Sequence, residues 1–142
     1  MNDPVTENRR IVLALVWSQD RLLIARRLTG AHQGGLWEFP GGRIEPSESP
    51  GNAAEREVAE ELGVRCVHVR QRPSFFFEYP DRQLEFFPVD CAWVSGEPQA
   101  LFALSPRWVT QSEIAKHDFP PANRELLQGL QALWGYPRRA SP

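Results

Sequence analysis

Cysteine and methionine are scarce in this chain, whose 142 residues include two cysteines and one methionine. Cys66 and Cys91 lie far apart in the sequence, and neither belongs to a closely spaced cysteine pair. The sequence therefore offers neither a disulfide framework nor a cysteine-type zinc site. We expect two structural thiols in a reducing compartment.

An excess of charge of one sign is also missing. The 16 basic and 18 acidic residues give a net charge of −2, so no global field marks a protein that binds DNA or a membrane surface. A polyanionic substrate would need local help from arginines or from a metal ion.

Long hydrophobic runs are absent as well. The longest apolar run, residues 11–17, is far too short to span a bilayer, and the polar residues 1–9 lack the apolar core of a signal peptide. We therefore expect a cytoplasmic protein without membrane contact. The length fits one domain, residues 1–142, with no repeat or linker. The tail at 137–142 is expected to be frayed.

Apolar runs between turn residues predict strands at 11–17, 21–26, 64–69, 75–79, 84–94 and 108–110, and residues 80–82 join two of them into a hairpin. A helix is predicted over 50–62, with Ser49 as its N-cap, Pro50 in its first position and Gly63 just past its end. A last helix is predicted over about 121–134, with four leucines on one side. The pattern predicts an α+β fold with a mixed sheet between helices.

The first helix carries three carboxylates within one arc. Glu57, Glu60 and Glu61 are three and four residues apart, so they project from one face. Carboxylates this close repel one another unless a hard divalent cation binds them. The alternative is a solvated acidic face in which Arg56 pairs with Glu60. Val58 and Leu62 anchor the helix to the sheet, and the small Ala53 and Ala54 are expected to leave room for a substrate.

The segment 42–64 resembles the Nudix box, a motif of one glycine, spaced glutamates, an Arg-Glu pair and a final glycine. Nine positions agree: Gly42, Glu48, Arg56, Glu57, Val58, Glu60, Glu61, Gly63 and Val64. The resemblance implies a Nudix-type α/β/α sandwich and an enzyme that splits a diphosphate linked to another group.

The same resemblance implies a role for each box residue. Glu57, Glu60 and Glu61, with the Gly41 carbonyl, would hold Mg²⁺, with Mn²⁺ as a possible substitute. Glu48 and Arg56 would brace the loop and the helix, Arg56 by orienting Glu57. Metal ions suit this chemistry because they neutralise a phosphoanhydride and activate water. The general base stays open between a glutamate inside the box and one outside it.

Further segments resemble the MutT-like group of Nudix hydrolases, which cleave 8-oxo-dGTP to the monophosphate and pyrophosphate. The matching segments are residues 25–27, 31–32, 37–40, 79–82, 96–98 and 118–123. By this resemblance Asn123 reads the base, and an amide suits a purine edge because it both donates and accepts. The resemblance places five more residues in the nucleotide pocket or its loops: Arg27, His32, Glu38, Phe39 and Arg82.

Each of these residues also has a purely structural interpretation. Asn123 is a favoured residue for capping the last helix, His32 could bond within its loop, and Arg27 could be a surface charge. Phe39 could be a core aromatic, as could Trp37 and the phenylalanines of the predicted strands (75–77, 86 and 87). One departure from the MutT-like pattern stands out: residues 99–104 carry no carboxylate, whereas the group has a further metal-binding glutamate there.

Two other functions remain open. The substrate could be CTP, dCTP or another nucleoside diphosphate derivative, since the box reads diphosphate and metal rather than base. The domain could also be a non-catalytic 8-oxo-guanine-binding module, although every box carboxylate is present. For the enzyme we expect a small-molecule nucleotide as partner, no stable binding of nucleic acid, and a monomer or homodimer.

Overall fold

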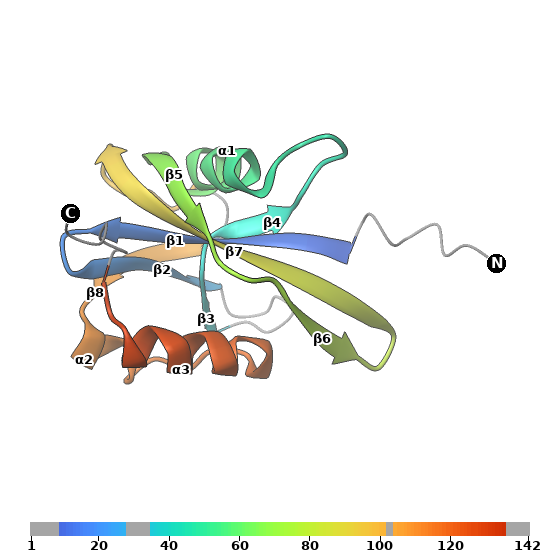
Figure 1. The fold of residues 1–142 in the computed structure, drawn as a ribbon. Coiled ribbons are helices and arrows are strands. Elements are labelled where there is room, and N and C mark those ends of the chain that lie inside the picture. The colour runs from blue at the N-terminus through green and yellow to red at the C-terminus, as the bar shows by residue number, and fades with distance from the viewer. Residues whose placement is uncertain (1–8, 28–34, 102–103, 136–142) are drawn as a thin grey trace, which may run out of the picture.

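The computed structural model describes residues 9–27, 35–101 and 104–135. His32, Phe102 and the tail at 137–142 lie outside these ranges. The described part forms three layers: one eight-stranded sheet with helix α1 (Pro50–Leu62) on one face and helices α2 (Gln111–Ile114) and α3 (Arg124–Ala132) on the other (Figure 1). The predicted α/β/α arrangement is confirmed. No helix among the described residues is long and apolar enough to cross a membrane.

The sheet is mixed, as predicted. Its main path runs β3 (Trp37–Glu38), β2 (Arg21–Arg27), β1 (Arg10–Ser18), β7 (Arg82–Ser95), β5 (Arg65–Gln71). Strands β1 and β7 pair in parallel, whereas the other pairs are antiparallel. Off this path, β4 (Gly41–Arg43) pairs with β1, β6 (Phe75–Tyr79) with β7, and β8 (Leu104–Val109) with β2.

Strand β1 shows how the sequence builds two cores, one on each face of the sheet. Val12, Ala14 and Val16 pack toward α1, and the alternate residues Leu13, Leu15 and Trp17 pack toward α3. This division follows from the period of two along a strand. The α1 core also takes in Val58 and Leu62, which confirms their predicted anchoring role. Ala53 and Ala54 are fully buried in the same core, so the expectation that they leave room for a substrate is wrong.

Helix α1 begins and ends where its cap residues predict. The Ser49 side chain accepts a hydrogen bond from the Asn52 N–H, Pro50 occupies the first turn, and the helix stops at Gly63. Gly63 adopts φ +67°, a left-handed conformation that glycine tolerates without strain. Because both ends are fixed, the register of the acidic residues along the helix is fixed too.

The end of the chain departs from the predictions in three ways. Strand β8 starts at Leu104 rather than at 108, and Pro106 lies inside it. The predicted last helix is a 3₁₀ turn, η2 (Pro121–Asn123), followed by the shorter α3, so Leu133 falls beyond the helix and is 80% exposed. The short helix α2 was not predicted. Phe76, which was expected in the core, is 60% exposed on β6.

Candidate active site

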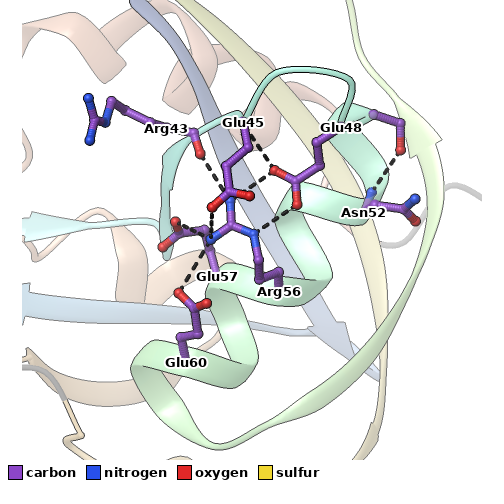
Figure 2. A network of polar contacts seen from close by, with 8 residues as sticks. Arg43, Glu45, Glu48, Asn52, Arg56, Glu57 and Glu60 are labelled. Carbon is purple, nitrogen blue, oxygen red and sulfur yellow. Dashed lines mark hydrogen bonds and ion pairs between the residues drawn. The ribbon is translucent and has the colours of Figure 1, made fainter. Parts of the chain in front are cut away.

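Arg56 lies at the centre of a polar network at the start of α1 (Figure 2). Its Nε and Nη2 donate to the two carboxylate oxygens of Glu48, at 2.8 and 2.9 Å. Its Nη1 donates to Glu57 Oε1 at 3.0 Å and to Glu60 Oε2 at 3.3 Å, and Nη2 also reaches the Arg43 carbonyl at 3.1 Å. The forked guanidinium thus ties the loop before α1 to the acidic face of the helix.

This network agrees with the roles that the resemblance implied for Glu48 and Arg56. The hydrogen bonds from Arg56 lower the pKa of the Glu48 carboxyl, and those to Glu48 and then Glu57 raise the pKa of Arg56. The Arg56–Glu60 pair, expected on a merely solvated acidic face, is also present, although Glu60 is half-exposed and its bond is the longest. The same contact that pairs Arg56 with Glu57 fixes the direction of that carboxylate.

The other glutamates face the glycines of β4. The Gly41 N–H donates to Glu61 Oε2 at 3.1 Å. A Cβ on Gly42 would come within 2.7 Å of the Glu57 carboxylate, so any other residue here would push that carboxylate out of its present place. Burial, then a side-chain hydrogen bond with Glu57 and the charge of Glu57, raise the pKa of Glu61 to about 9.

Two carboxylates forced together in a partly buried place fit a bound cation, which would replace the shared proton and remove the repulsion. Hard oxygen donors of this kind select Mg²⁺ or Mn²⁺. No group of three or more acidic, histidine or cysteine side chains in the described part is already arranged to hold a metal ion. Arg56 engages Glu60 and Glu57, while Glu61 turns to Gly41. The ligand set Gly41, Glu57, Glu60 and Glu61 therefore stays a prediction.

A cavity of about 300 Å³ adjoins the glycines of β4. Its walls include five of the residues that the resemblance placed around the nucleotide, and Gly41: Arg27, Glu38, Phe39, Gly41, Arg82 and Asn123. These residues come from five separate elements of the chain, and the fold brings them together. Two other hollows, beside α3 and around Trp134, lie away from the box.

The polar groups of the cavity are held in place. Arg27 Nε donates to Glu38 Oε2 at 2.9 Å, and burial raises the pKa of Glu38 despite this partner. Asn123 is only 5% exposed, and its side chain makes no capping hydrogen bond at the start of α3. Asn123 therefore stands at the N-cap position of α3 without capping it through its side chain, and its amide remains available to a ligand.

The cavity also contains residues that sequence reasoning missed. Tyr79 and Leu84 line it from the β6–β7 hairpin, and the Arg82 guanidinium lies 5.8 Å from the centre of the Tyr79 ring. The alternation along β6 could have indicated Tyr79, because it stands beside the matched Arg82 motif and two positions from the inward-packing Phe77. Phe39, although 2% exposed, also borders the cavity and stacks on Phe119 at 5.2 Å.

Known proteins of one family are similar to most of this chain. A family model for the NUDIX domain matches residues 11–129. An 8-oxo-dGTP diphosphatase of Escherichia coli K12 is 34% identical over 116 residues, which is 80% of this chain and 88% of the relative. A CTP pyrophosphohydrolase of the same strain is 31% identical over 123 residues, covering 87% of this chain and 91% of the relative.

Solved structures give the same picture. A structure from work on MutT of Aliivibrio salmonicida and Vibrio cholerae superimposes with a TM-score of 0.65 at 26% identity, covering 88% of this chain and 99% of that one. A MutT protein from Methanosarcina mazei Go1 gives a TM-score of 0.74 at 24% identity, over 87% of this chain and 92% of that one, and supports the fold. The chain therefore belongs to the Nudix hydrolases, in their MutT-like group.

Proposed function

We propose that this enzyme hydrolyses 8-oxo-dGTP, and dGTP less well, to the monophosphate and pyrophosphate. The carrying observation is the buried Asn123 amide, which borders the cavity next to the box glycines without a capping role in the fold. A base seated there would place its triphosphate beside Gly41 and Gly42. The 34% identity to an 8-oxo-dGTP diphosphatase supports this substrate.

Glu57, Glu60, Glu61 and the Gly41 carbonyl would hold Mg²⁺ in this proposal. The ion would neutralise the phosphate oxygens and activate the attacking water. Arg56 keeps the Glu57 carboxylate in place, and Glu48 keeps Arg56 in place. Arg27 and Arg82 supply positive charge at the cavity wall, which the almost fully buried Phe39 also borders.

A cytidine nucleotide is the second candidate substrate, and one comparison favours it. The CTP pyrophosphohydrolase relative aligns over a longer stretch of the chain than the 8-oxo-dGTP diphosphatase does. The amide of Asn123 could also bond to a pyrimidine, so base discrimination must be measured.

The test compares kcat/KM for 8-oxo-dGTP and dGTP in the wild type and in Asn123→Ala. Loss of a base-reading group should reduce kcat/KM for 8-oxo-dGTP by about tenfold or more and reduce dGTP hydrolysis much less. Asn52→Ala, an exposed amide on α1, serves as the control and should leave the ratio unchanged. An equal loss for both substrates would show that Asn123 does not read the oxidised base.

A further inference from the structure

Two walls of the cavity are connected by three residues that lie outside it: Trp37, Arg107 and His117. Trp37 precedes Glu38 and Phe39, which line one wall. The backbone N–H of Trp37 donates to the backbone carbonyl of Asp118 at 2.8 Å. Asp118 opens the segment that leads through Phe119 to Asn123 on the other wall. The side chains of Arg107 and His117 then close around the Trp37 ring: the Arg107 guanidinium lies 4.9 Å above its centre, and the His117 ring meets it edge-on at 4.7 Å.

The hydrogen bonds of His117 indicate one tautomer of its ring. Its Nδ1 lies 2.8 Å from the Glu113 carbonyl, and because a carbonyl only accepts, Nδ1 must carry the proton. Its Nε2 lies 3.0 Å from Arg107 Nη1, and because a guanidinium only donates, Nε2 must be the acceptor. Neutral His117 with the proton on Nδ1 satisfies both contacts. It therefore holds Arg107 on Trp37 while anchored to α2.

We propose that Arg107 and His117 are positioning residues that set the nucleotide affinity of this chain by clamping Trp37 between the two walls of its cavity. Neither side chain borders the cavity, so neither would touch the nucleotide. They act through Trp37, since the two residues that follow it in the chain, Glu38 and Phe39, do line the cavity. A shift of the Trp37 ring would move the Glu38–Phe39 wall relative to Asn123, and small misplacements of binding groups cost affinity steeply. The inference rests on the proposed function.

The test measures the Kd of nucleoside monophosphates, the products of the proposed reaction, by calorimetry with 8-oxo-dGMP, dGMP and CMP. His117→Ala and Arg107→Ala should each weaken binding by about three- to tenfold, the usual worth of one hydrogen bond. The fold loss of affinity in the double variant should be smaller than the product of the two single losses, because either single change already breaks the Arg107–His117 contact. His117→Gln retains an acceptor near Nε2 and should recover part of the affinity.

Gln111→Ala is the matched control. Gln111 lies on α2, the helix to which His117 is bonded, and like His117 it donates one hydrogen bond to a carbonyl, that of Gln131 at 2.8 Å, but no contact with Trp37 is seen for it. Its Kd should stay within about twofold of the wild type. Independently of binding, ¹⁵N NMR should show the His117 proton on Nδ1.

Two outcomes would overturn the inference separately. If the wild type binds one of these monophosphates and His117→Ala binds it as well as Gln111→Ala does, the clamp does not set affinity, whichever base is preferred. If the wild type binds none of the three, the proposed function fails and the inference fails with it.

Discussion

A single arginine organises the acidic face of α1. Arg56 donates hydrogen bonds to Glu48, Glu57, Glu60 and the Arg43 carbonyl, so one side chain joins the loop to the helix (Figure 2). A lysine could not replace it, since an ammonium lacks the planar fork that binds Glu48 through two oxygens. Glu57 depends on this arrangement for its direction.

Glu57→Gln should lower kcat by about a hundredfold or more under saturating Mg²⁺, because the amide retains the shape but loses the charge that a metal ion requires. The fold should survive, since the change is isosteric, and circular dichroism checks this. Glu125→Gln, an exposed glutamate in the first turn of α3, is the control. If Glu57→Gln turns over near the wild-type rate, Glu57 is not a metal ligand that the reaction requires.

Glu48→Gln should change the pH dependence of stability. The hydrogen bonds from Arg56 lower the folded-state pKa of Glu48, so its contribution to stability is present above the unfolded carboxyl pKa and is lost as pH falls through the folded value. The variant should therefore be less stable than the wild type at pH 7, and the gap should close in acid.

Urea unfolding at a series of pH values measures this gap. Glu45→Gln provides the comparison, because Glu45 is largely exposed and lies 3.9 Å from Arg56. If the difference in free energy of unfolding between Glu48→Gln and the wild type stays constant as the pH falls, the Arg56–Glu48 pair does not stabilise the fold as stated.

At the scale of elements, a buried charge inside β7 ties that strand to β1 and to the residue that follows β5. Asp90 on β7 is fully buried and accepts bonds from Arg72 Nε at 2.8 Å, from Arg72 Nη2 at 3.1 Å and from Trp17 Nε1 at 2.8 Å. Arg70 lies farther away, at 3.6 Å, and is half-exposed. The two arginines therefore contribute very differently.

Arg72→Ala should reduce the free energy of unfolding by about 3 kcal/mol, because it leaves a buried carboxylate without its close cation. Arg70→Ala, two residues away, removes a half-exposed cation that lies 3.6 Å from Asp90 and should cost about 0.5 kcal/mol. Chemical denaturation of the two variants measures the difference. Equal losses would mean that Asp90 does not depend on Arg72.

The elements that the sequence predicts well are those with local signals. Helix α1 follows from Ser49, Pro50 and Gly63, whose preferences act within one turn of the helix ends. Strand β8 starts four residues before the predicted strand at 108–110, and Pro106 lies inside it. Pro106 is tolerated since β8 pairs with β2 and lies off the main path of the sheet. The sequence does not distinguish the 3₁₀ turn at Pro121–Asn123 from the first turn of an α-helix, because proline is common at both.

At the scale of the whole molecule, the candidate site is a product of topology. Arg27, Glu38 and Asn123 are far apart in sequence, and no periodicity indicates that they meet. The resemblance to the MutT-like group indicated these residues as candidates for the nucleotide pocket, and the fold places them around one cavity. The Arg107–His117 clamp could not be predicted, because its members belong to no motif and meet Trp37 only when the fold brings β8 and the segment after α2 to β3.

The central claim is that this assembly cleaves a nucleoside triphosphate in a metal-dependent way. The most direct measurement is steady-state hydrolysis of 8-oxo-dGTP, dGTP, CTP, dCTP and ADP-ribose with Mg²⁺ and with EDTA, with the products identified. We expect monophosphate and pyrophosphate, no turnover in EDTA, and a kcat/KM for 8-oxo-dGTP about a hundredfold above that for dGTP, or about 2.7 kcal/mol. Preference for a cytidine nucleotide or ADP-ribose would contradict the base assignment, and no hydrolysis of any substrate would contradict the proposed function itself.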